Sequence, residues 1–284
     1  MARKENLEQF VEQKFSQPRQ VNGGAKSGKA IVHTHTTFSD GNGTPEDHLN
    51  FCVENDIQVM AITDHDVIEG ALKALQEAKQ RDLSVSVVVG EEISTAQGHC
   101  GGLFLQEAIK MGSSLLETAR EIHRQDGLVV IPHLGFGPSP ISISPKTVRR
   151  LYEQGEWVDA IEVVCPNFSL RHIQEALGLC EEYQIAQLGA NDCHFIKDLK
   201  RGFLTFFEGE TAEDLRKSIR QRKTLAVRGE SLSNVSLKEN IIRHYRGLTW
   251  GLPVKIASSP IFISTFFALR RAQVLNLFEK ISKY

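Results

Sequence analysis

Residues 30–35 read AIVHTH, a short apolar run followed at once by two histidines one residue apart. Six further apolar runs follow along the chain, at residues 58–63, 85–89, 128–131, 160–164, 185–188 and 203–207. Each is long enough for a strand and unbroken enough to be covered on both faces. Helical patterns separate them, at residues 67–81, 113–125, 145–154, 170–183 and 212–222, and a capping signature, TPED, begins at Thr44. This alternation predicts parallel strands joined by crossover helices, as in an α/β barrel or a doubly wound sheet.

The polar residues that follow five of the seven expected strands are of metal-ligand types. The loops at the carboxyl ends of barrel strands converge on one face, so we expect these side chains to share a rim. Taken singly, His-x-His can be solvated, His99 can sit in a glycine-flanked loop and His133 can be a packed core histidine. Together, six imidazoles and three carboxylates at one mouth would be costly without cations. The expected ligands are His33, His35, Asp40, His65, Glu92, His99, His133, Asp192 and His194.

This donor set indicates the class of metal and of chemistry. Mixed imidazole and carboxylate ligands suit Zn²⁺, Mn²⁺ or Fe²⁺, and nine ligands exceed the needs of one ion. We therefore expect two or three divalent ions that share a bridging carboxylate. Such clusters favour hydrolysis, of phosphoesters above all. The remaining four histidines lie in helical patterns and are expected at the surface: His48, His123, His172 and His244.

Composition and charge narrow the alternatives. The 33 Lys+Arg and 35 Asp+Glu residues give a net charge of −2, which offers no strong nucleic-acid signature and favours a small substrate. The five cysteines form no CxxC pair and are odd in number, which favours a reducing, cytoplasmic compartment. The charged N-terminus does not resemble a secretory signal. The apolar stretch at residues 252–269 is interrupted by Pro253, Lys255 and Pro260, so we expect a packed C-terminal helix or a partner-binding surface and no transmembrane segment.

Several ordered motifs resemble those of the PHP (polymerase and histidinol phosphatase) family. They are HTHTTFSDG at residues 33–41, ITDHD at 62–66, GEEIST at 90–95, NDCH at 191–194 and KRGFLT at 200–205. The resemblance implies a distorted seven-stranded (β/α)7 TIM-like barrel, in agreement with the seven apolar runs. It covers residues 30–230, which leaves an N-terminal helix at residues 5–16 with a flexible linker at 21–29, and a C-terminal helical extension at 231–284.

The resemblance also implies roles for single residues. His33, His35, Glu92 and Asp192 would hold a first metal, while Glu92 would bridge to a second that His99 and His133 complete. Asp40, His65 and His194 would hold a third. Glu92 is chosen over Glu91 because the family glutamate directly precedes the Ile-Ser-Thr stretch. The implied catalytic residues, acting with a metal-bridging hydroxide, are Glu92, Asp192, His194 and Asp64.

Three further assignments concern the surroundings of these ligands. Arg201 is a candidate for binding the substrate phosphate, because a guanidinium matches phosphate oxygens, although it could equally be a solvated surface arginine. Asp64 is expected to orient a ligand histidine. Glu162 is expected to line the barrel floor.

These observations favour a metal-dependent phosphoester hydrolase that acts on a small phosphorylated metabolite or nucleotide. Only 40 residues separate Glu92 from His133 (133 − 92 − 1), which leaves no room for the large helical insertion of the family's nucleotide 3′-phosphatases. A phosphodiesterase or exonuclease on short nucleic-acid ends remains open. So do a non-catalytic PHP scaffold module and an amide or C–N hydrolase.

Overall fold

The computed structural model describes residues 2–15, 26–136, 141–166 and 168–229. All of them belong to one unit, Met1–Val235. The expected N-terminal helix is α1 (Ala2–Phe15). The expected C-terminal extension, the apolar stretch at 252–269 and His244 lie outside the described residues, as does most of the expected linker. The end of that linker was assigned wrongly, since Ser27–Ile31 forms the first strand.

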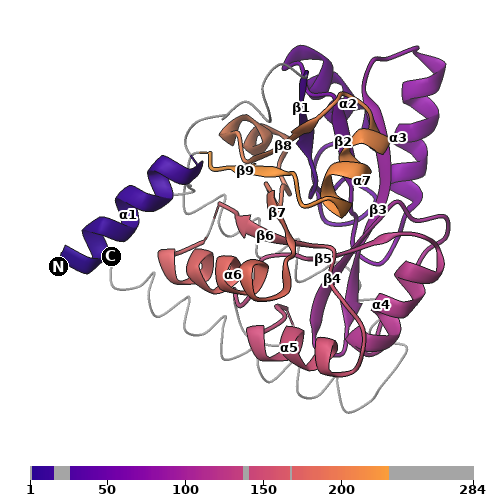
Figure 1. The fold of residues 1–284 in the computed structure, drawn as a ribbon. Coiled ribbons are helices and arrows are strands. Elements are labelled where there is room, and N and C mark those ends of the chain that lie inside the picture. Colours follow the sequence, from indigo (N-terminus) through magenta and orange to yellow (C-terminus); the bar gives the residue numbers. More distant parts are fainter. Residues whose placement is uncertain (1, 16–25, 137–140, 167, 230–284) are drawn as a thin grey trace, which may run out of the picture. The chain divides into compact units, whose positions relative to one another are not determined.

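Nine strands form one sheet within the described part of the chain (Figure 1). Neighbouring strands follow the order β7-β6-β5-β4-β3-β2-β1-β8-β9. All seven apolar runs are found among them, usually with ends shifted by one residue. The strands are β1 (Ser27–Ile31), β2 (Val59–Ile62), β3 (Ser86–Thr95), β4 (Gly98–Leu103), β5 (Leu128–Ile131), β6 (Ala160–Val164), β7 (Ala186–Gly189), β8 (Leu204–Glu208) and β9 (Leu225–Val227).

The sheet is mixed, which corrects the expectation of seven parallel strands. β1, β2 and β3 are parallel, and so are β5, β6 and β7. β4 is antiparallel to both of its neighbours, β8 is antiparallel to β1, and β9 is antiparallel to β8. β4 escaped prediction because glycines replace an apolar run. A Cβ at Gly101 would lie only 3.2 Å from Cβ of Val130, so this strand needs glycine to approach β5.

The helices lie outside the sheet (Figure 1), and α2 to α7 begin within two residues of their predicted starts, whereas the 3₁₀ helix η1 was not predicted. Capping boxes start four of them, at Thr44, Ser114, Ser169 and Thr211, which satisfies backbone N–H groups of the first turn. The elements are α2 (Pro45–Glu54), α3 (Glu69–Gln80), α4 (Leu115–Arg124), α5 (Pro145–Glu153), α6 (Leu170–Tyr183), the 3₁₀ helix η1 (Ile196–Arg201) and α7 (Ala212–Arg220).

The core divides into an interior and an outer layer. Along β6, Ala160 belongs to one apolar cluster with Val32, Val130 and Leu188, whereas Ile161 packs with residues of α5 and α6 in another. Successive strand residues point to opposite faces, so the first cluster fills the space that the curved sheet encloses. The five cysteines are all free and buried, so this core forms without a disulfide.

Side-chain hydrogen bonds join the two edges of the curved sheet. The backbone N–H of Gly189 donates to Oγ1 of Thr205 at 3.0 Å, and the Thr205 hydroxyl donates back to the Gly189 carbonyl at 3.0 Å. Oγ1 of Thr224 donates to the Gln187 carbonyl at 2.8 Å. These bonds link β7, one edge strand, to β8 and to the residue that precedes β9, the other edge strand. The sheet is therefore nearly closed where β7 meets β8 and β9, and the predicted barrel class is confirmed with nine strands in place of seven.

Candidate metal centre

Glu92 lies at the centre of the expected ligands. Its Oε2 is 3.2 Å from Nε2 of His33, 3.2 Å from Nε2 of His35 and 3.4 Å from Nδ1 of His65. Its Oε1 is 2.7 Å from Nε2 of His133 and 3.0 Å from Nδ1 of His99. The two oxygens of one carboxylate thus face two different sets of imidazoles, as a bridging ligand requires.

Two aspartates complete the cluster on either side of His35. Oδ1 of Asp192 is 3.5 Å from Nε2 of His35 and 3.5 Å from Nδ1 of His194. On the other side, Oδ1 of Asp40 is 3.6 Å from Nδ1 of His35, and its Oδ2 is 3.1 Å from Nε2 of His194. His35 is fully buried and presents one ring nitrogen to each aspartate.

The structure therefore brings all nine expected ligands together, and eight of them fall into three groups whose donor atoms could each hold an ion. Because the groups share members, they form one continuous cluster and not three separate sites. The groups are His33–His35–Glu92–Asp192, His35–Asp40–His65–His194 and His65–Glu92–His99. His133 stands outside these groups and joins the cluster through its 2.7 Å contact with Glu92.

An antiparallel hairpin of β3 and β4 supplies two of the ligands. Glu92 lies in β3 and His99 in β4, with Glu92 opposite Gly101 and Ser94 opposite His99. His99 was expected in a loop, so this placement is a correction. A parallel bridge between His65 and Glu92 ties the hairpin to the segment after β2.

Two ligands have a backbone conformation that is unusual for their residue types. His133 has φ of 31° and Asp192 has φ of 45°, in the left-handed region that favours glycine. Such strain is found where surrounding structure forces a side chain into a functional position. Both residues lie within three positions of a strand end, His133 after β5 and Asp192 after β7, and their side chains are directed at Glu92 and His35.

Asp64 supports the loop between His35 and Asp40. Its Oδ1 accepts from the backbone N–H of Thr36 at 2.7 Å and from the Ser39 hydroxyl at 2.6 Å, and its Oδ2 accepts from the Thr36 hydroxyl at 2.7 Å. The expectation that Asp64 contacts a ligand histidine is therefore wrong. The carboxylate instead shapes the loop that carries two ligands.

His48 was expected at the surface but is fully buried. Its Nε2 is 2.9 Å from Oγ1 of Thr34, and its Nδ1 is 2.9 Å from the Thr44 carbonyl. Burial lowers its pKa. A neutral imidazole here joins α2 to the segment of His33 and His35. The sequence indicates only that a histidine occupies an inward-facing position of this helix, and it does not indicate this role.

The adjacent glutamates have different environments. Glu91 is also buried, but one of its oxygens accepts from the backbone N–H of Ile109 at 2.8 Å and the other has no hydrogen-bond partner. Burial raises the pKa of Glu91 to about 8. The choice of Glu92 as the ligand agrees with this geometry.

Arg201 ends η1, and its Nε lies 3.1 Å from Oδ1 of Asp198. Its role in binding phosphate stays a prediction.

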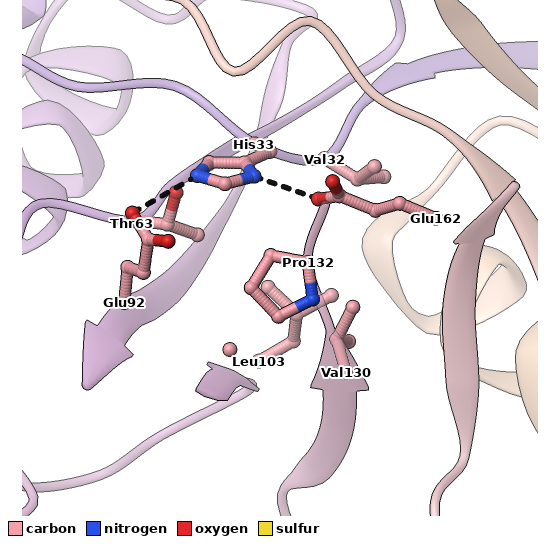
Figure 2. Close-up of a pocket in the computed structure, with 9 residues that line it drawn as sticks. Val32, His33, Thr63, Glu92, Leu103, Val130, Pro132 and Glu162 are labelled. Carbon is pink, nitrogen blue, oxygen red and sulfur yellow. Dashed lines mark hydrogen bonds and ion pairs between the residues drawn. The ribbon is translucent and has the colours of Figure 1, made fainter. Parts of the chain in front are cut away.

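Glu162 was expected only to line the barrel floor, but it also contacts an expected ligand. Its Oε1 is 2.7 Å from Nδ1 of His33. Figure 2 shows His33 between Glu92 and Glu162, above the apolar side chains of the barrel interior.

Electrostatics within the cluster show how strongly its groups interact. Burial alone would lower the pKa of His35, but hydrogen bonds to Asp192 and Glu92 outweigh it and raise the pKa to about 10. For Glu92, burial would raise the pKa, yet the charges of His65, His99 and His33 hold it well below the usual range. Burial dominates at His65 and lowers its pKa to about 3. Opposite charges in a buried site hold one another in ionised form.

The donor geometry fits metal ions. Four ligand atoms about 2.0–2.1 Å from a tetrahedral zinc are separated by roughly 3.3 Å. Nε2 of His33 and Nε2 of His35 are 3.1 Å apart, and both are 3.2 Å from Oε2 of Glu92. Nδ1 of His133 is buried with no hydrogen-bond partner. Nitrogen and oxygen donors at these spacings match the ligand preferences of zinc, manganese and iron.

Comparison with known proteins agrees with this site. The PHP domain family model matches residues 32–182. This chain belongs to the PHP domain family. An uncharacterized protein of Methanocaldococcus jannaschii is 36% identical over 116 residues, which cover 37% of this PHP chain and 67% of that protein. The 5′-3′ exoribonuclease Rnm of Escherichia coli is 41% identical over 64 residues, which cover 22% of each chain.

A solved structure shares the fold of this PHP chain. It is a two-domain protein from Bacteroides vulgatus, described as containing a predicted PHP-like metal-dependent phosphoesterase, with a TM-score of 0.62 and 21% identity. The match covers 76% of this chain and 68% of that chain. Family membership and the clustered donors together imply divalent metal ions as cofactors.

Across residues 2–15, 26–136, 141–166 and 168–229, no helix has the length and apolar character of a membrane span.

Proposed function

We propose that this chain is a metal-dependent phosphoester hydrolase that acts on a small phosphorylated metabolite or nucleotide at a site for two or three divalent ions. One observation carries the proposal: three groups of donor atoms overlap, and they share His35, His65 and Glu92. Divalent ions held there would activate water as a nucleophile and neutralise charge on the phosphoryl oxygens. The net charge of −2 supports a small substrate over a long polyanion.

Exposure of the ligands supports a direction of approach for the substrate. The side chains of His194 and Asp192 are 24% and 23% exposed, whereas those of His35 and Asp40 are 0% and 1% exposed. The phosphoester therefore reaches the cluster from the side of His194 and Asp192. In this arrangement His33, His35 and Glu92 would hold metal at the buried side of the cluster, and His194 at the exposed side would hold metal with Asp40 or assist proton transfer.

The test combines elemental analysis with hydrolysis of an aryl phosphate monoester and an aryl phosphate diester. We expect two or three transition-metal ions per chain and turnover that collapses in His33→Ala and Asp192→Ala. His172→Ala and Asp56→Ala are the matched controls, because these side chains lie outside the cluster, and they should retain turnover. Unchanged turnover in both ligand variants would refute the assignment. Bound metal without hydrolysis across a broad phosphoester panel would favour a non-catalytic PHP module.

The similarity to exoribonuclease Rnm favours a second candidate, removal of nucleotides from short nucleic-acid ends. Turnover of a 5′-phosphorylated oligoribonucleotide at a much higher kcat/KM than mononucleotides would support it. A preference for mononucleotides or sugar phosphates would support the small substrate. Activity on amides that inorganic phosphate does not inhibit would point to a C–N hydrolase.

We also propose a cytoplasmic location, which the five free, buried cysteines support.

A further inference from the structure

Glu162 is a charged residue in the interior of the barrel. It occupies the middle of β6, on the same face as Ala160, whose side chain lies in the interior cluster. Its neighbours Ile161 and Val163 pack outward against the helices. Glu162 is only 1% exposed, so its carboxylate must find its partners within the protein.

Those partners are two ligand-bearing segments from different strands. Oε1 of Glu162 is 2.7 Å from Nδ1 of His33, which follows β1. Oε2 accepts a hydrogen bond from the backbone N–H of His133, which follows β5, at 2.9 Å. Neither oxygen belongs to a group of candidate metal donors. One carboxylate thus contacts two expected metal ligands. One oxygen contacts the ring of His33, which belongs to the same donor group as Glu92 and Asp192, and the other oxygen contacts the backbone of His133.

The contact of His33 with Glu162 leaves Nε2 as the ring nitrogen that would face a metal. An imidazole that binds metal through one nitrogen donates its other N–H to an acceptor, and that acceptor fixes the orientation of the ring. With Nδ1–H directed at Glu162, the lone pair of Nε2 is directed at Nε2 of His35 and Oε2 of Glu92, 3.1 and 3.2 Å away. Around the ring the wall is formed by Val32, Thr63, Leu103, Val130 and Pro132 (Figure 2). Of these only Thr63 has a polar side chain, and its hydroxyl is bonded to the backbone N–H and carbonyl of Thr34.

We propose that Glu162 is a positioning residue for the metal centre. One of its oxygens holds the ring of His33, and the other holds the backbone of His133. Glu162 thereby fixes the relative positions of two ligands that face different oxygens of Glu92, and it does not bind metal itself. This inference rests on the proposed metal-dependent function. It goes beyond that function by assigning the interior carboxylate of β6 a role that its place at the barrel floor does not indicate.

The test is Glu162→Gln, compared with Glu156→Gln as a matched control. Glu156 also makes a carboxylate–imidazole contact, a partly buried one of 2.8 Å to His123, but it precedes β6 and lies away from the donor groups. Zn²⁺ and Co²⁺ affinities are measured by chelator competition, with the Co²⁺ absorption spectrum as a second readout. Loss of such a partner typically weakens metal binding about 10–100-fold. We expect that loss in Glu162→Gln, with an altered Co²⁺ spectrum, and wild-type values in Glu156→Gln.

Each outcome decides the proposal. Wild-type affinity and spectrum in Glu162→Gln would overturn it, and so would equal weakening in both variants, because that would reflect a general loss of stability. Circular dichroism and thermal melting of the metal-free proteins check folding. If Glu162→Gln does not fold, Glu162→Asp replaces it, since the shorter carboxylate keeps the charge and withdraws the contacts. Weakened binding in a chain that hydrolyses no phosphoester would support the positioning role while refuting the proposed function.

Discussion

Replacement of Asp64 should separate the loss of a charge from the loss of three hydrogen bonds. In Asp64→Asn the amide oxygen can keep the two bonds of Oδ1, from the Thr36 N–H and the Ser39 hydroxyl. The amide NH₂ then faces Oγ1 of Thr36, a hydroxyl that can rotate to accept. In Asp64→Ala all three donors lose their acceptor, and the Thr36 N–H is fully buried.

The magnitudes follow from these contacts. Hydrogen bonds to a charged group contribute about 1.5–3 kcal/mol each, and neutral ones about 0.5–1.5 kcal/mol. Partial compensation by the hydroxyls brings the expected loss in Asp64→Ala to about 3–5 kcal/mol, against about 1–2 kcal/mol in Asp64→Asn. For a domain of this size 1 kcal/mol shifts Tm by about 2–4 °C, so the two variants should differ by roughly 5–10 °C.

Thermal and urea unfolding in the presence of a chelator measure this difference without a contribution from bound metal. Ser39→Ala is the control, since it removes one donor and should cost about 1 kcal/mol. The Asp64→Ala variant should also have a lower affinity for metal, because the loop that Asp64 holds carries His35 and Asp40. Equal stability of Asp64→Ala and Asp64→Asn would refute the role of this carboxylate as the acceptor that holds the loop.

Three further predictions concern other parts of the barrel. Burial would lower the pKa of His123, but Asp159 and Glu156 outweigh it and raise that pKa above its value in the unfolded chain. The stability that His123 contributes is therefore complete below the unfolded pKa and is lost as pH rises through the folded pKa. The unfolding free energy of wild type relative to His123→Gln should therefore fall with increasing pH; a constant difference would contradict this. Gly189→Ala places a Cβ against the Leu204 carbonyl at the barrel seam and should destabilise by about 1–3 kcal/mol in urea unfolding, whereas Gly178→Ala, with open space in α6, should stabilise by about 0.5–1 kcal/mol. All five cysteines are buried, and burial raises the pKa of Cys52 to about 12, so a thiol reagent should label none in the native protein and five in urea.

The elements that could be predicted are those whose signal is local. Apolar runs such as residues 128–131 are strands because they are covered on both faces, and TPED at Thr44 begins a helix because its side chains cap the first turn. The two missed strands lack such a signal. β9 has three residues, and β4 is rich in glycine because Gly101 and Gly102 pack against Val130 and Ile122, a constraint that only the folded barrel imposes.

The same division explains which parts of the site the sequence disclosed. Ligands could be recognised because histidines and acids stand at strand ends, and a barrel brings such ends together. The residues that hold the ligands in place gave no comparable signal. Asp64 stands next to a ligand, yet its carboxylate turns to Thr36 and Ser39.

Glu162 shows most clearly why a supporting residue escapes sequence reasoning. Within the run AIEVV it interrupts an apolar pattern, which indicates an unusual interior position but not a partner. Its partners lie 129 and 29 residues away, at His33 and His133. Burying that carboxylate would be costly unless both oxygens found donors, and the closure of the barrel supplies one donor from β1 and one from β5. The interior charge is thus tolerated only in a chain that has already brought the two ligand segments together, so the metal centre and the barrel depend on the same contacts.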